Sequence, residues 1–432
     1  MILNETFDVN EKGHLTIAGL DSIELSQNFG TPAYYLDTDA VRRMCRIYRN
    51  SFSTYFGKNS YPVYAGKALC YKGIYKIIND EGLFADCVSS GELHTINAAG
   101  FPMEKVFFHG NNKTDEDLKY ALQLGVGHIV VDGLDELFAL DSIAAELSKK
   151  THILLRITPG IDPHTHKKII TGNVDSKFGM AIMTGQAFDF VKAALSRKNL
   201  ILDGFHCHVG SQIFDIEPFT EAADIMLAFV AKISAEYGYT AKILNLGGGF
   251  GVRYTEDDPH IDYVRNVRDL GAEIDKICAQ YRINKPDIFM EPGRSIVAAA
   301  GVTLYTCGSV KTVNRFRNYI SVDGGMTDNP RYTLYQSKYT VINAEKAAET
   351  PDFECTVAGR CCESGDLLAE GVNIAKPVRG DIIAVLVTGA YNHSMASNYN
   401  RIPRPPIIEI SKGEAKIAVR REKFDDLIAL DL

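Results

Sequence analysis

Short apolar segments recur along the first two thirds of the chain, and each ends in a polar or glycine-rich junction. Most are rich in Val, Ile, Leu or Phe, and most precede a stretch with helical periodicity. The first five begin 21 to 24 residues apart and the later ones about twice as far apart. This alternation predicts a (β/α)8 barrel, which carries its chemistry at the carboxyl ends of the strands. The segments begin near Pro62, Leu83, Lys105, His128, His152, Leu202, Lys242 and Asp287.

Two helices can be placed from their caps and their periodicity. Residues 37–50 have apolar side chains at i, i+3, i+4 and i+7, and Asp37 can cap that helix. A second helix starts at Thr114 with the capping-box pattern Thr-x-x-Asp and stops at Gly125. The long junction from residue 152 to 179 is either a lid over the site or an ordinary loop.

The period changes after Glu291, where short strand-like segments follow one another without long helices between them. This change predicts a second, mostly antiparallel β domain. The run from His14 to Ala18 has no place in the barrel, so we expect it to add a strand to that C-terminal sheet. The predicted domains are an N-terminal strand region, 1–32, the barrel, 33–298, and the β domain, 299–432. The predicted strands of the β domain are 301–310, 317–323, 353–358, 381–388, 405–410 and 414–419.

Composition narrows the class of protein. Apolar residues make up 46% of the 432 residues, yet no segment approaches the roughly 20 apolar residues of a membrane span. The first 30 residues lack a secretory signal, so a cytoplasmic location is expected. A net charge of −8 without a dense basic block disfavours nucleic-acid binding and favours a small-molecule substrate. The nine cysteines include one close pair, Cys361-Cys362, with no second pair at ligand spacing, so no metal site is predicted.

Candidate chemistry lies at three of the strand ends. Lys67 closes the first strand, a glycine triplet at 247–249 closes the seventh, and Glu291-Pro292-Gly293-Arg294 closes the eighth. A lone glycine triplet is usually a tight turn, and a lone arginine is usually a surface ion-pair partner. At the ends of the seventh and eighth barrel strands, however, they favour a phosphate site. A phosphorylated ligand near a lysine amine suggests pyridoxal 5'-phosphate, an aldehyde that condenses with amines.

Seven motifs extend this interpretation: Tyr64 to Ala68, His206 to Gln212, Gly247 to Gly251, Glu291 to Arg294, Asp328 to Tyr335, Cys362 to Asp366 and Gly389 to Met395. In these motifs the chain resembles the fold-type III pyridoxal-phosphate decarboxylases, which have alanine-racemase-like barrels. More narrowly, it resembles the diaminopimelate decarboxylases. The resemblance runs in order from about residue 30 to 405.

The resemblance implies roles for the residues around the cofactor. Lys67 forms a Schiff base with pyridoxal phosphate, His208 stacks on its ring, and Ser211 holds its phosphate. Glu291 keeps the pyridine nitrogen protonated, which makes the ring an electron sink and favours decarboxylation over racemisation. Tyr391 hydrogen bonds near the phosphate. By strand alternation His206 lies on the same face as His208, so it is a candidate support. The remaining cofactor-binding residues are Gly247, Gly248, Gly249, Pro292, Gly293 and Arg294.

The resemblance also implies a substrate and a homodimer. Cys362 donates a proton after carbon dioxide leaves, and it enters the partner chain's active site together with Glu363. The far end of the substrate would be held by Arg294, Arg331, Tyr335, Glu363 and Tyr391. Arginines suit a carboxylate and Glu363 suits an ammonium group, as in meso-diaminopimelate, whose decarboxylation gives L-lysine. The alternatives are a decarboxylase of ornithine, arginine or a carboxylated polyamine such as carboxynorspermidine, and a non-catalytic protein that binds pyridoxal phosphate.

Overall fold

The computed structural model describes residues 4–160 and 175–432, which form two units. One unit comprises Met44–Gly251 and Ile261–Gly293, and the rest of the described chain forms the other. Part of the candidate lid, 161–174, lies outside the described residues. Among the helices described, none is long and apolar enough to cross a bilayer.

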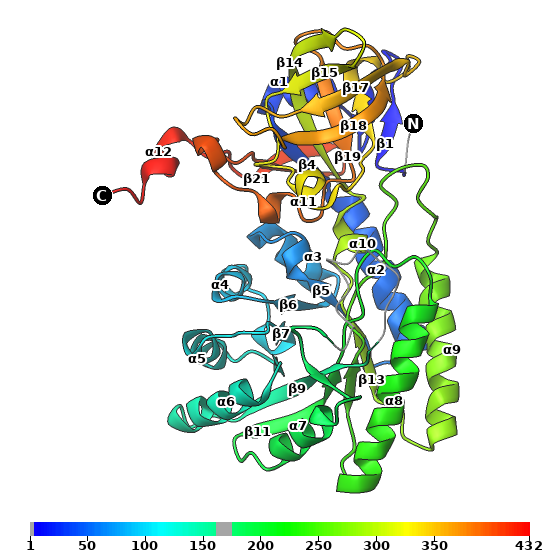
Figure 1. Cartoon of the computed structure of the whole chain (residues 1–432), viewed down its shortest axis with the longest axis vertical. Helices are drawn as coiled ribbons and strands as arrows, with labels where there is room; N and C mark the ends of the chain where they lie inside the picture. Colours follow the sequence, from blue (N-terminus) through cyan, green and yellow to red (C-terminus); the bar gives the residue numbers. More distant parts are fainter. Residues whose placement is uncertain (1–3, 161–174) are drawn as a thin grey trace. The chain divides into compact units, whose positions relative to one another are not determined.

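The first unit contains the predicted barrel (Figure 1). Eight parallel strands pair in a closed ring, because the last strand pairs with the first and the fourth with the fifth. Each strand begins within two residues of its predicted start. A short strand, β10 (Met180–Ala181), pairs in parallel with the last two residues of β9, Ile157 and Thr158. The ring consists of β5 (Tyr61–Ala65), β6 (Phe84–Cys87), β7 (Val106–Phe108), β8 (His128–Val131), β9 (Thr151–Thr158), β11 (Leu200–His206), β12 (Ile243–Asn245) and β13 (Asp287–Met290).

Apolar side chains fill the inside of the ring. Six strands each contribute one buried residue to a single cluster, and Tyr61 and Phe84 pack against it. The barrel is therefore a packed core, and ligands are confined to its two ends. The cluster consists of Val63, Phe107, Val130, Leu154, Ile243 and Phe289.

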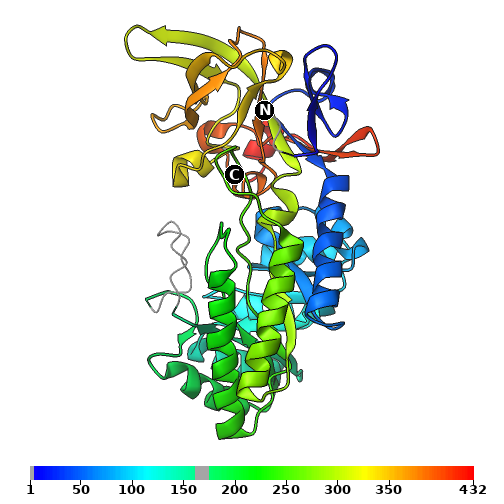
Figure 2. The same cartoon turned by 90° about the vertical axis from the view of Figure 1, so that its right-hand side faces the viewer.

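Helices alternate with these strands, as the periodicity predicts. The capping box at Thr114 and the left-handed Gly125 that ends the helix are both confirmed. Asp37 accepts a hydrogen bond from the Ala40 amide (2.9 Å), and the helix that it caps runs on to Tyr55. The two longest helices, α8 and α9, lie side by side (Figure 2). The helices are α2 (Thr38–Tyr55), α3 (Lys72–Asp80), α4 (Ser90–Ala98), α5 (Asp115–Leu124), α6 (Leu134–Glu146), α7 (Gln186–Leu195), α8 (Glu217–Tyr237) and α9 (Tyr263–Tyr281).

The second unit is built on a mostly antiparallel sheet, as predicted. Its path is β18-β17-β15-β14-β4-β20-β21, with β19 also paired to β14 and to β16. Only the β15–β17 and β4–β20 pairs are parallel. The strands are β4 (Ala33–Asp37), β14 (Gly301–Val313), β15 (Arg317–Val322), β16 (Val341–Asn343), β17 (Phe353–Ala358), β18 (Leu367–Ile374), β19 (Ile382–Leu386), β20 (Ile407–Ser411) and β21 (Glu414–Val419). Short helices α10 (Arg294–Val297), α11 (Arg331–Tyr335) and α12 (Phe424–Ile428) complete it.

The expectation that the run from His14 to Ala18 joins the C-terminal sheet is wrong. Its strand, β2 (Leu15–Ile17), pairs with β1 (Phe7–Val9) and β3 (Leu20–Asp21) in a separate antiparallel sheet, which α1 (Ser22–Phe29) follows. Tight turns on both sides, with Gly13 and Gly19 at positive φ, return the chain to its immediate neighbours. The N-terminal strand that does enter the large sheet is β4, between β14 and β20.

Candidate active site

Lys67 follows the first barrel strand in a short 3₁₀ turn, Gly66–Ala68, with its side chain exposed. The turn is fixed by the amide of Gly66, which donates to the buried carboxylate of Asp86 (2.9 Å). A Cβ at Gly66 would lie 2.5 Å from the hydroxyl of Tyr75, so the turn requires glycine. Burial raises the pKa of Asp86 well above its usual value, and the charge of Glu291 adds to this while Lys67 opposes it. The ammonium group of Lys67 thus lies close enough to the buried Asp86 to act on its charge.

The glycine triplet forms a tight backbone curve after β12. Gly247 and Gly249 have φ values of +70° and +122°, which L side chains rarely adopt. A Cβ at Gly248 would overlap the carbonyl oxygen of Glu291. The amide of Gly247 donates a hydrogen bond to Oδ1 of Asn245 (2.9 Å), and the amide of Gly248 donates to Nδ1 of His208 (3.1 Å). These two amides are thus bonded within the protein, and the absence of side chains lets a ligand approach the backbone of this curve closely.

Glu291 is buried in a cage of polar side chains. Asn245 donates to its Oε1 atom (2.8 Å), and the Nε2 atoms of His109 and His206 each lie 3.1 Å from the same oxygen. Burial opposes its ionisation, but the two imidazoles outweigh burial and hold the pKa of Glu291 well below its usual value. Burial also lowers the pKa of His206, to about 4. At neutral pH the site therefore holds the carboxylate charge of Glu291 beside a neutral His206.

The other predicted barrel residues surround this cage. His208 and Ser211 follow β11, and both are partly buried. Burial drives the pKa of His208 well below its usual value, so its ring is neutral. The Ala65 amide donates to the carbonyl of Pro292 (3.2 Å), and a Cβ at Gly293 would lie 2.6 Å from the Cβ of Ala65. The ends of β5, β12 and β13 are thus packed closely together, as the motifs predict.

A second group of predicted residues lies in the β unit. The guanidinium of Arg294 is buried, donates to the hydroxyl of Tyr254 (2.7 Å) and lies 4.7 Å from the ring centre of Tyr391. Arg331 lies 5.4 Å from the same ring and 5.4 Å from that of Tyr335. Tyr391 itself has φ +63°, a strained conformation for a bulky residue. Two arginines that share one aromatic ring provide a strongly cationic surface for a carboxylate.

Cys362 and Glu363 lie on an exposed turn of the β unit. The amide of Cys362 donates to the Asn400 side chain (2.8 Å), and Asp366 binds the amide of Cys361 (2.6 Å). Burial and the neighbouring Asp366 raise the pKa of the Cys361 thiol to about 11. Of this adjacent pair, Cys362 is the more accessible.

Comparison with known proteins assigns the family. The family described as "Pyridoxal-dependent decarboxylase, pyridoxal binding domain" matches residues 38–298. Diaminopimelate decarboxylase from Bacillus methanolicus is 45% identical over 98% of this chain and 98% of its own length. That from Bacillus subtilis (strain 168) is 43% identical over 100% of this chain and 98% of its own length. The chain belongs to the diaminopimelate decarboxylase family.

A solved structure agrees with this family assignment. Diaminopimelate decarboxylase from M. jannaschii in co-complex with L-lysine is 32% identical, with a TM-score of 0.91. The match covers 100% of this chain and 99% of that one. The same barrel and β unit therefore occur in a family member that was crystallised with an amino acid.

Three polar residues at the carboxyl end of this chain's barrel were not predicted from the sequence: Asp86, His109 and Asn245. Each is a single polar residue at or just after the end of a strand, β6, β7 and β12 respectively. Their position could have identified them, because polar residues at the carboxyl ends of barrel strands commonly form the active site. His206, predicted as a support by strand alternation, ends β11 next to Glu291.

Proposed function

We propose that this chain decarboxylates meso-2,6-diaminopimelate to L-lysine and carbon dioxide, the last step of lysine biosynthesis. The observation that carries the reaction class is the ionised Glu291, which is buried among Asn245, His109 and His206. The substrate is supported by full-length relatives that carry the name diaminopimelate decarboxylase. The cytoplasmic location expected from the sequence remains a prediction.

The residues of the barrel rim fit pyridoxal 5'-phosphate. The curve at Gly247 to Gly249 leaves no room for side chains, which suits the close approach of a phosphate to the backbone. Glu291 is ionised and buried at this end of the barrel, and the Nε2 atoms of His109 and His206 each lie 3.1 Å from its Oε1 atom. The protonated nitrogen of the cofactor's pyridine ring is a hydrogen-bond donor that would pair with such a carboxylate. When bound, the cofactor supplies an aldehyde for the substrate amine and a protonated ring that accepts the electron pair left by carbon dioxide.

The chain's own residues would divide the work. Lys67 would hold the cofactor covalently through Nζ, and Ser211 and the glycine curve at 247–249 would hold its phosphate. His208 would contact the ring, while Glu291 would keep the proton on the ring nitrogen. Cys362 would return a proton to the carbon that loses carbon dioxide.

Substrate choice would rest on the β unit. Arg294 and Arg331 would bind the distal carboxylate, with Tyr335 and Tyr391 packed against the guanidinium groups. Glu363 would pair with the distal ammonium group. Ornithine and lysine lack a distal carboxylate and would leave these arginines without their anion, which opposes their binding.

The first test is release of carbon dioxide by the purified chain with added pyridoxal phosphate. Meso-diaminopimelate, L-ornithine, L-arginine and L-lysine should be assayed in parallel. Release from diaminopimelate alone is expected. Release only from another amino acid would keep the cofactor chemistry and overturn the substrate, whereas no release with a fully bound cofactor would favour a binding protein.

Arg331→Ala tests the distal site separately. Loss of a guanidinium that grips a carboxylate should lower kcat/KM for diaminopimelate by ~10²-fold to 10³-fold, mostly through KM. Arg379→Ala is the matched control, because this arginine is exposed in the same unit. An unchanged KM in Arg331→Ala would remove this residue from the substrate site.

We further propose a homodimer in which each active site takes Cys362 and Glu363 from the partner chain. The exposed position of both residues supports this. Lys67→Ala and Cys362→Ala should each be inactive alone. After the two variants are mixed and reassociated, about a quarter of the sites should recover, because half of the dimers are mixed and each has one intact site. No recovery in a confirmed mixed dimer would place both residues in one chain's site.

A further inference from the structure

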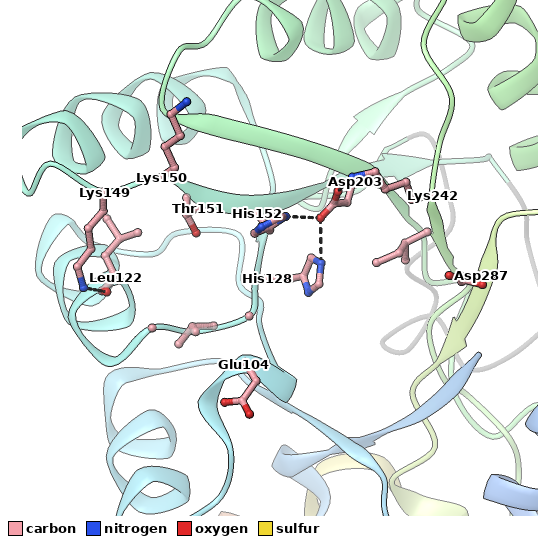
Figure 3. Close-up of a pocket in the computed structure, with 14 residues that line it drawn as sticks. Glu104, Leu122, His128, Lys149, Lys150, Thr151, His152, Asp203, Lys242 and Asp287 are labelled. Atoms are coloured by element: carbon pink, nitrogen blue, oxygen red, sulfur yellow. Dashed lines mark hydrogen bonds and ion pairs between the residues drawn. The ribbon is translucent and has the colours of Figure 1, made fainter. Parts of the chain in front are cut away.

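A second cluster of two histidines and a carboxylate lies where the barrel strands begin. His128 starts β8, His152 lies near the start of β9, and Asp203 belongs to β11. Figure 3 shows both imidazoles directed at the carboxylate of Asp203. Nε2 of His128 lies 3.3 Å, and Nδ1 of His152 2.5 Å, from the same oxygen, Oδ2. The three ligand atoms lie within 4.8 Å of one another.

The backbone of β11 directs the side chain of Asp203 toward the two histidines. The register between β9 and β11 shifts between Leu202 and Gly204, so Asp203 is the extra residue of a β-bulge. Bulges redirect a side chain at the rim of a barrel. A Cβ at Gly204 would overlap the carbonyl oxygen of Ile243, so the glycine allows the strands to close around the bulge. The position of Asp203 is thus built into the backbone.

Neighbouring groups orient two of the three side chains. The ring of His128 stacks on Phe107, with centroids 4.7 Å apart and planes at 10°. Lys242 donates to the other oxygen of Asp203, Oδ1 (2.9 Å), which leaves Oδ2 directed at the imidazoles. A group that fixes one carboxylate oxygen while the other faces a ligand set is the usual second layer of a metal site.

The cluster is accessible from solvent. It lines a cavity of about 610 Å³ whose wall also includes Glu104 and Asp287. The side chain of Asp203 is 6% exposed, that of His128 15%, and that of His152 48%. A small ion can therefore reach the cluster, and His152 can move without repacking the core.

We propose that His128, His152 and Asp203 bind one divalent transition-metal ion of the zinc class per chain. Tetrahedral zinc with Zn–N and Zn–O bonds of about 2.0–2.2 Å places ligand atoms roughly 3.3–3.6 Å apart. The separation from His128 to Asp203 already has this value. The ion replaces the proton between His152 and Asp203, and the half-exposed His152 moves outward by about 1 Å to reach this spacing. Water completes the coordination, and the ion ties three strands together at the end of the barrel away from Lys67.

Sequence spacing could not reveal this site, because its ligands come from three strands separated by 24 and 51 residues. The site does not depend on the proposed reaction. Its ligand class follows from the donor set, since imidazole and carboxylate suit zinc, cobalt and nickel rather than calcium.

The test uses the full chain saturated with pyridoxal phosphate and freed of metal with a chelating resin. Calorimetric titration with ZnCl₂ should give one saturable site per chain, and the unfolding temperature should rise with zinc concentration. His152→Ala and His128→Ala should each weaken binding by at least ~100-fold, because even a group that only orients a ligand contributes about 10-fold to 100-fold. His94→Ala is the matched control, since this exposed histidine bonds only to Tyr120 among the contacts described.

Cobalt distinguishes this cluster from the nine cysteines. Co²⁺ bound by imidazole and carboxylate lacks the intense near-ultraviolet charge-transfer band of thiolate ligation. A thiolate band, the absence of a saturable site, or unchanged affinity in both histidine variants would overturn the proposal. Loss of binding in His206→Asn but not in His152→Ala would assign the ion to the other histidine cluster, and would also overturn it.

Discussion

The barrel carries two clusters of the same composition, one at the ends of its strands and one at their beginnings. In the first, His109 and His206 lie beside the carboxylate of Glu291. In the second, His128 and His152 lie beside that of Asp203. We call them the rim cluster and the base cluster.

The clusters differ in burial and in their other partner. The neutral side-chain amide of Asn245 donates a hydrogen bond to Glu291, and the two histidines beside Glu291 are buried. Asp203 instead forms an ion pair with the ammonium group of Lys242, and His152 is half exposed. Among the described residues Glu291 therefore has no ion pair with a lysine or arginine, whereas Lys242 neutralises part of the charge of Asp203. The same three groups thus suit catalysis in one place and structure or metal binding in the other.

The largest expected effect is that of Glu291→Gln. The amide keeps the shape but removes the charge that would hold a proton on the cofactor. We expect kcat to fall by ~10²-fold to 10³-fold, by analogy with other electrostatic catalytic groups. The assay is carbon dioxide release from diaminopimelate at saturating cofactor, with circular dichroism to verify folding.

Asp203→Asn is the matched change in the base cluster. Its kcat should stay within ~2-fold of the parent, since surface and structural charges far from the chemistry contribute little to catalysis. If the two variants lost activity equally, the division of roles between the clusters would be wrong.

The sequence predicted the barrel better than it predicted the rim cluster. The strand starts were predicted correctly because apolar runs and regular spacing are local signals. Lys67, Glu291 and the glycine triplet could be singled out because each stands within a motif. The strand β18 was missed, since the exposed Glu370-Gly371 interrupts its apolar pattern. His109 was missed because a single polar residue after a strand has no local pattern. Its contact with Glu291 arises only when β7 and β13 come together in the closed ring.

His109→Ala sharpens the comparison within the rim cluster. Because His109 helps to lower the pKa of Glu291, its removal should raise that pKa. Loss of one polar partner of a buried charge, about 1.4 kcal/mol, corresponds to a ~10-fold loss of kcat/KM. The acid limb of the kcat/KM profile should also move to higher pH, which a purely structural defect would not produce.

His94→Ala serves as the control for His109→Ala, because His94 is an exposed histidine of the same unit. It should change neither kcat/KM nor the pH profile. An acid limb that stays in place in His109→Ala would show that this histidine does not set the charge of Glu291.

An effect on stability is expected from the base cluster. Asp203 is buried but two of its partners, His152 and Lys242, are well exposed to solvent, which reduces what the ion pairs contribute. Asp203→Asn should therefore lower the free energy of unfolding by about 2 kcal/mol, between the values for exposed and buried pairs. Urea unfolding in the presence of a chelator measures this without a contribution from bound metal.

The smallest expected effect is a change with pH in the difference in unfolding free energy between the parent and Asp203→Asn. Burial opposes the charge of Asp203, but hydrogen bonds from His128, Lys242 and His152 outweigh it and hold its pKa below the ordinary value. A carboxylate whose pKa is lower in the folded chain stabilises the fold above its unfolded pKa, about 3.9, and this stabilisation is lost as pH falls through the folded pKa. The stability gap between the parent and Asp203→Asn should therefore be full at pH 7 and shrink progressively below pH ~4. A gap that is constant down to acid unfolding would mean that the carboxylate charge contributes nothing, and that packing of the Asp203 side chain accounts for the whole difference.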